Sequence, residues 1–136
     1  MVDKKIIEAR LDGLSFLDQN QKELQLSSDQ IILRCSAIYG CEMPFTDIFA
    51  NILSEQIISF INGFLYGNLT LAEIILAMEI NLPQSFMISN AVDIEEIQFT
   101  GRCVNVAFLA KVLKNYKALR FSLDRKMQNH IDGYQL

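Results

Sequence analysis

The residues that could do chemistry in this chain are basic and lie close together near its end. They fall within fifteen positions: Lys111, Lys114, Lys117, Arg120 and Arg125. Side chains of this kind contact nucleic-acid phosphates, and such binding weakens steeply with salt because each contact releases condensed counterions. Phe121 stands among them, where its ring could stack on a base. The segment predicts weak DNA binding through these five side chains, although a solvated helix face would explain the same charges.

Charge is distributed unevenly along the 136 residues. Residues 102–136 carry seven basic and two acidic side chains, whereas residues 35–101 carry eight acidic and no basic ones. The formal charges are −1 for residues 1–34, −8 for 35–101 and +5 for 102–136, within a total of −4. Such segregation is typical of a protein that meets its partners through charged surfaces.

Two surfaces are candidates for binding a protein partner. Phe121 is expected to be exposed, and with Leu123 and Tyr134 it would form an apolar docking patch. The acidic stretch is an equally good candidate, and its test residues are Glu42, Asp47 and Glu55.

Few residues could perform catalysis. The single histidine, His130, falls near the end of the chain, where a buried general base is not expected. The glycine-rich motifs that hold nucleotide phosphates do not occur in the sequence. Glu95 and Glu96 are adjacent and would point in different directions, and together with Asp93 they lack the spacing of a calcium loop. The sequence therefore predicts no enzymatic activity, no metal and no cofactor.

The cysteines and the hydropathy pattern indicate the compartment. Cys35, Cys41 and Cys103 are odd in number and lack zinc-ligand spacing, so we expect reduced, buried side chains. No apolar run approaches the roughly 20 residues of a membrane-spanning helix. We expect a cytoplasmic protein that makes no membrane contact.

Helical periodicity predicts an all-α fold, with one compact bundle of about five helices forming a single domain over residues 1–136. The predicted helices cover residues 3–11, 27–39, 45–66, 71–81 and 106–127. An irregular segment is expected at about 84–104 and a flexible tail at about 128–136.

Start and stop signals support these boundaries. Ser27 with Gln30, and Thr70 with Glu73, have the spacing of capping boxes. Gly40 fits the left-handed end of a helix. In the last helix, capped by Asn105, the apolar residues, Tyr116 among them, share one face and the lysines lie opposite.

The helix expected at 45–66 has the longest apolar stripe, which predicts that it is the central helix. Phe45, Phe49 and Phe60 could meet a second copy of the chain, whereas complete burial would explain the same pattern in a monomer. The sequence leaves a homo-oligomer open.

Two segments resemble the C-terminal module of DnaD-type primosome proteins from bacteria, phages and mobile elements. Residues 69–77 follow the pattern L-T-x-x-E-I-x-x-A, and residues 105–116 follow N-x-x-F-L-x-x-V-L-x-x-Y, with Tyr116 where the family has Trp. The resemblance covers about residues 70–120. It implies a non-enzymatic accessory role in replication, loading a helicase or organising the replisome, with a replicative helicase and DNA as partners.

The acidic stretch supports an alternative of a different class. A phage or mobile-element protein that inhibits or modulates a host factor, as anti-defence proteins do, would bind a single host protein tightly and would not need DNA. Charge reversal at Glu42, Asp47 and Glu55 should break such a complex, and this response distinguishes the two functions.

Overall fold

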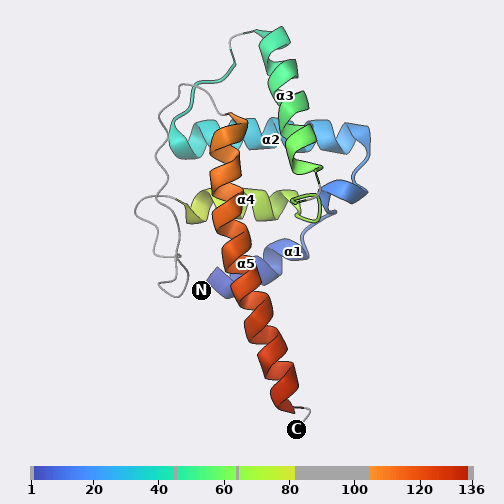
Figure 1. The fold of residues 1–136 in the computed structure, drawn as a ribbon. Helices are drawn as coiled ribbons and strands as arrows, with labels where there is room; N and C mark the ends of the chain where they lie inside the picture. The colour runs from blue at the N-terminus through green and yellow to red at the C-terminus, as the bar shows by residue number, and fades with distance from the viewer. Residues whose placement is uncertain (1, 45, 64, 82–104, 135–136) are drawn as a thin grey trace.

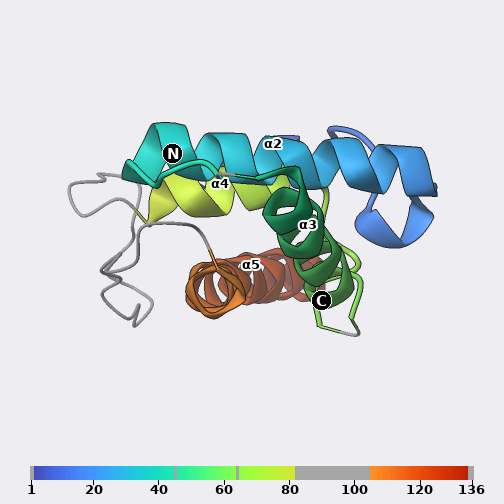
Figure 2. The same ribbon diagram turned by 90° about the horizontal axis from the view of Figure 1, so that it is seen from above.

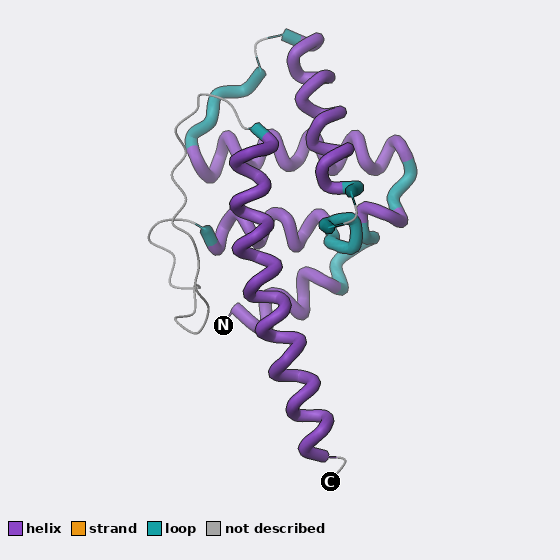
Figure 3. Tube along the Cα trace, in the orientation of Figure 1, coloured by secondary structure: helices purple, strands orange, loops and turns teal. Residues whose placement is uncertain are grey.

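The computed structural model describes residues 2–44, 46–63, 65–81 and 105–134, with side chains as far as His130 in the last range. The described part is all-α, as the sequence predicts, and Figure 3 shows helices joined by short loops. Its elements are α1 (Val2–Arg10), the short 3-10 helix η1 (Phe16–Asp18), α2 (Gln21–Tyr39), α3 (Asp47–Ile61), α4 (Leu71–Ile80) and α5 (Val106–Tyr134). The irregular segment expected at 84–104 lies outside the described residues.

The helices form two crossed layers. Helices α2 and α4 run side by side across the molecule, and α3 and α5 cross them on one common face (Figures 1 and 2). Helix α4 contacts α1, α2 and α5. Most of its side chains are buried, from Ile74 at its start to Ile80 at its end. The central helix is therefore α4, and the prediction that the helix at 45–66 is central is wrong.

Helix α3 is shorter than the predicted helix at 45–66. It begins after Thr46, whose side chain accepts a hydrogen bond from the Phe49 backbone N–H at 3.1 Å, and it ends at Ile61. Its first half extends away from the layer of α2 and α4 (Figure 1). Its buried face is the one that meets α2 and α5, where Leu53 and Ile57 belong to the core.

Helix α2 starts earlier than the sequence predicts. Its N-cap is Asn20, whose side chain accepts from the Glu23 backbone N–H at 2.8 Å, while the Glu23 carboxylate accepts from the Asn20 N–H. The box predicted at Ser27 and Gln30 is therefore wrong. Ser27 lies within the helix, where its buried hydroxyl donates to the Gln19 side chain at 2.8 Å. The end at Gly40 is confirmed, because Gly40 adopts the left-handed conformation with φ of 72°.

The connection between α1 and α2 holds the start of α4. The Phe16 and Leu17 N–H groups donate to the carbonyls of Leu69 and Gly67, at 3.0 and 2.9 Å. The Thr70 hydroxyl donates to the Ala9 carbonyl at the end of α1 at 2.7 Å. These bonds bring residues far apart in the sequence to one end of α4, where the main polar cluster of the core forms.

Helix α5 starts as predicted and ends later. The Asn105 side chain accepts from the Phe108 N–H at 2.8 Å, which confirms the N-cap. The helix continues to Tyr134, beyond the end at about residue 127 that the sequence predicts. Among its side chains as far as His130, the last buried one is Leu123, and the helix beyond it extends past the other elements (Figure 1).

Candidate protein-binding site

A buried polar cluster joins α4 to α5. The Glu73 carboxylate, which is fully buried, accepts from the Thr70 N–H at 3.2 Å through Oε1 and from the Tyr116 hydroxyl at 2.6 Å through Oε2. Arg120 Nε lies 3.2 Å from the same Oε2. This contact is ionic, because Nε has no hydrogen-bond partner in the described structure. The cluster neutralises a carboxylate that would otherwise be buried alone at a high cost.

The ionisation of Tyr116 follows from this arrangement. Burial is the main cause that raises the pKa of the Tyr116 hydroxyl, and the hydrogen bond to Glu73 and the charge of Glu73 raise it further. The nearby Arg120 and Arg10 oppose the rise without reversing it. Tyr116 is therefore a neutral donor at physiological pH, and the cluster serves the packing of α4 on α5.

Arg120, one of the five residues predicted to contact DNA, instead contacts Glu73 within the chain. Its side chain is only 14% exposed and faces Glu73, so it does not lie on an outer cationic face as expected. Its position on the helix explains the difference, since Arg120 follows Tyr116 by four residues and shares its face.

Lys117 is also engaged within the chain. Its ammonium donates to the Leu65 carbonyl at 2.6 Å and lies 5.7 Å from the centroid of the Tyr66 ring. It therefore ties α5 to the turn between α3 and α4.

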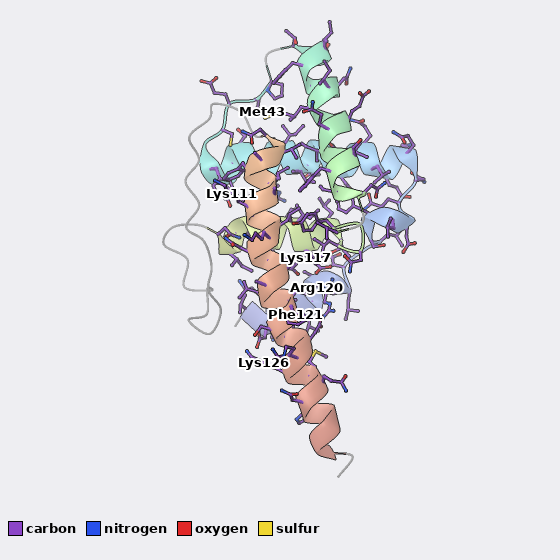
Figure 4. All side chains as sticks on the ribbon, in the orientation of Figure 1. Met43, Lys111, Lys117, Arg120, Phe121 and Lys126 are labelled. Atoms are coloured by element: carbon purple, nitrogen blue, oxygen red, sulfur yellow. The ribbon has the colours of Figure 1, made fainter. Side chains whose placement is uncertain are left out.

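The remaining basic residues form an exposed ridge on α5. We define the α5 ridge as Lys111, Lys114, Phe121 and Arg125, all of which are exposed. Phe121 is 62% exposed, and the Arg125 guanidinium lies 5.9 Å from its ring centroid. Figure 4 shows Lys111 in the first part of α5 and Phe121 farther along the same helix. Of the proposed docking patch, Phe121 is exposed and Leu123 is buried, and the side chain of Tyr134 lies outside the described part.

The second surface lies on α3, where the sequence names Asp47 and Glu55 for protein binding and Phe49 as a residue that could meet a second copy. Ile48, Phe49 and Ile52 are 74%, 45% and 48% exposed, and Glu55 on the next turn is exposed as well. We define these four residues as the α3 surface. The sequence predicts that these three apolar residues belong to one helix stripe, and it leaves open whether that stripe is buried or meets a second copy of the chain. The signal that could have found them is the polar pair Glu55 and Gln56, which shares their face at helical spacing.

Two further acidic test residues lie close to this surface in the sequence. Asp47 on the first turn of α3 is exposed, and so are Glu42 and Met43 in the loop that precedes the helix. An exposed apolar area bordered by charge of one sign is typical of a protein-binding surface.

A hollow of about 500 Å³ lies between the α3 surface and α5. Its lining includes Glu55, Gln56 and Ser59 of α3 and Val106 at the start of α5. A second hollow, of about 380 Å³, lies between α2 and α4, with Leu14, Leu26 and Ile75 among its lining residues. Among the described residues that line the two hollows, none is a histidine or a cysteine.

The other candidates for chemistry do not form a site in the described structure. Cys35 and Cys41 are buried and not disulfide-bonded; the Cys35 thiol lies 3.2 Å from the Met78 sulfur, and burial raises its pKa to about 12. Such a thiol is a poor nucleophile, since the reactive form is the thiolate. His130 is exposed near the end of α5. Within the described residues, no three ligand-type side chains form a metal-binding group.

Three expected features fall outside the described residues. They are Cys103, the acidic group Asp93, Glu95 and Glu96, and Phe45. Of the phenylalanines proposed to meet a second copy, Phe49 is exposed and Phe60 is partly buried beside Tyr66, with ring centroids 5.3 Å apart.

Comparisons with protein-family models, with curated proteins and with solved structures give no significant match to this chain. None of the helices in the part of the chain described here is both long and apolar enough to cross a membrane.

Proposed function

We propose that this protein is a non-enzymatic accessory protein of DNA replication that binds a protein partner through the α3 surface. The observation that carries the proposal is the exposure of Ile48, Phe49 and Ile52 beside Asp47 and Glu55. Exposed apolar side chains on consecutive helix turns supply affinity when covered, and the acids around them select a basic partner. A replicative helicase, or another protein that acts with it, is the partner we expect.

The place in replication rests on the resemblance of residues 70–120 to DnaD-type primosome proteins. Supporting it, both resembling segments are helical and pack together, and the Glu and Tyr of the two patterns, Glu73 and Tyr116, are hydrogen-bonded. The two patterns therefore belong to one helix pair. A shared helix pair does not by itself determine a function, and the proposal depends on binding.

DNA has a secondary place in this proposal. Lys111, Lys114 and Arg125 are exposed, whereas Arg120 is mostly buried beside Glu73 and Lys117 is partly buried and donates to the Leu65 carbonyl. The ridge that remains has few phosphate contacts to offer, and the acidic body repels DNA. We expect DNA contact to be weak and to help only once the protein partner has bound.

Affinity capture tests the proposal. The tagged protein is incubated with a nuclease-treated lysate of its source organism, and the bound proteins are compared with those bound by the Ile52→Asp variant. The proposal predicts that a replicative helicase or primase is retained by the wild-type chain and lost from the variant. Lys22→Glu, a reversal of an exposed charge on α2, is the matched control and should retain the partner.

The modulator of a host factor is the second candidate, favoured by the exposure of Glu42, Asp47 and Glu55 around α3. This function predicts capture of one host enzyme that is unrelated to replication. If reversal of the three charges abolishes that capture, the result would support this function and reject the replication role.

A further inference from the structure

Helices α3 and α5 lie next to one another on the same face of the molecule and carry opposite charge. Figures 1 and 2 show both helices in front of the layer made by α2 and α4, and the two helices contact each other. The exposed acids Asp47 and Glu55 lie on α3, whereas the exposed Lys111 and Lys114 lie on α5. The hollow lined by Glu55 and Val106 separates the two surfaces.

We propose that a second copy of this chain covers this face, with the α3 surface of each copy against the α5 ridge of the other. The dimer covers the partner-binding surface, so that self-association and partner binding exclude one another. This regulatory consequence rests on the proposed function, whereas the dimer itself does not.

Charge complementarity selects the second copy as the occupant. A two-fold interface brings the same face of two molecules together, so the face must be complementary to itself. Pairing α3 with α3 would oppose acids such as Glu55, and pairing α5 with α5 would oppose lysines such as Lys111. Pairing α3 with α5 in both directions places each acidic surface against a basic one. One contact made in this way generates the second by symmetry.

The apolar side chains supply the driving force. Ile48 and Ile52 are separated by one helical turn, and Phe49 stands beside them, so the three form one continuous exposed strip. On the α5 ridge, which would face this strip in the dimer, Phe121 is exposed. Burial of these side chains would favour association, and the charges would set the orientation and the partner choice.

Paired charge-reversal variants test the dimer. Variant A carries Asp47→Lys and Glu55→Lys, and variant B carries Lys111→Glu and Lys114→Glu. Size-exclusion chromatography with light scattering gives the mass of each protein alone and of an equimolar mixture, and circular dichroism verifies that each variant is folded. We expect the wild-type chain to be a dimer whose dissociation constant rises with salt.

The variants should behave as complementary halves. In variant A alone both contacts oppose basic residues, and in variant B alone both oppose acidic ones. Each variant should therefore be monomeric, with a dissociation constant raised by about 100-fold or more. In the mixture, every contact again joins opposite charges, and a heterodimer should form. The single reversal Lys22→Glu should leave the wild-type dimer intact.

Three results would overturn the dimer. They are a monomeric wild-type chain at every concentration, a dimer that survives in either variant alone, and a mixture of folded variants that stays monomeric. These outcomes are separate from the proposed function. Capture of a helicase by a monomeric chain would reject only the dimer, and a dimer that captures no replication protein would reject only the proposed function.

Discussion

Tyr116 on α5 donates a hydrogen bond to Glu73 on α4, with 2.6 Å between the hydroxyl and carboxylate oxygens. Both residues are fully buried and lie 43 positions apart in the sequence. Glu73 also caps its own helix through Thr70 and pairs with Arg120. One carboxylate thus stabilises the start of α4 and fixes the register of α5 against it.

Replacement of Tyr116 by Phe should destabilise the fold. The substitution preserves the ring and removes one hydrogen bond to a charged group, which contributes about 1.5–3 kcal/mol. We expect urea unfolding to give a free energy of unfolding that is lower by about that amount. The dependence of this free energy on urea concentration should change little. The exposed Phe121 on the same helix gives the control, since Phe121→Leu should change stability by less than about 0.5 kcal/mol. Equal stability of Tyr116→Phe and the wild-type chain would contradict the role assigned to this bond.

Glu73 and Arg120 should be strongly coupled in stability. Arg120→Met alone leaves a buried carboxylate with less compensation, and Glu73→Gln alone leaves a nearly buried guanidinium, so each should cost about 3–5 kcal/mol. The double variant should cost clearly less than the two changes added together. The pair of Lys126 and Asp3, 3.3 Å apart and exposed, is the control, because Lys126→Met should cost at most about 1 kcal/mol. Strict additivity of the Glu73 and Arg120 changes in a double-mutant cycle would show that the buried pair is not coupled.

Stability should decline at alkaline pH. Burial raises the pKa of Tyr116, Tyr39 and Tyr66 above the ordinary value, so the folded state holds their protons more tightly than the unfolded state. This contribution is complete below about pH 10, the pKa of an unfolded tyrosine, and is lost as the pH rises above it. Cys35, with a pKa of about 12, adds a loss that begins near pH 8.5.

Urea unfolding at a series of pH values measures this effect. The Tyr116→Phe variant lacks one of the three tyrosines, so its stability should fall less steeply above about pH 10 than that of the wild-type chain. Identical slopes would mean that Tyr116 ionises equally in both states.

Reversal of the α5 ridge should reduce DNA retention. We expect the wild-type chain to bind a labelled duplex only at low salt, because few phosphate contacts are available. Lys111→Glu with Arg125→Glu should abolish this binding, measured by fluorescence anisotropy. Arg120→Met, which changes a residue engaged with Glu73, should leave the DNA affinity unchanged if the variant is folded. Unaltered binding after reversal of the ridge would exclude this helix as the DNA contact.

The helix starts of α4 and α5 could be predicted because their signals are local. Thr70 and Asn105 each accept a backbone hydrogen bond from the residue three positions later, an interaction fixed by neighbouring residues. The same logic failed at Ser27, where the spacing of a cap occurs inside α2. Asn20 with Glu23 provides an equally good cap about two turns earlier, and only the packing of the whole helix distinguishes the two.

The apolar stripe of α3 could not be assigned from the sequence. The spacing of Ile48, Ile52 and Ile57 predicts an apolar stripe on a helix. Which of these residues are buried depends on where α2 and α5 lie. Likewise, the charges of Lys117 and Arg120 are visible in the sequence, whereas their partners, the Leu65 carbonyl and Glu73, are tertiary contacts. The fold class was therefore predictable. Of the candidate site, the acidic residues and Phe49 could be named from the sequence, whereas the exposure of Ile48 and Ile52 could not.

The most direct test of the proposed function is the affinity of the purified chain for the purified replicative helicase of its source organism. Isothermal titration calorimetry would compare the wild-type chain with Ile48→Asp and Ile52→Asp, two changes of exposed side chains that should leave the fold intact. The account predicts a defined stoichiometry for the wild-type chain and a loss of at least about tenfold in affinity for each variant. Absence of binding, or equal binding by all three proteins, would contradict it.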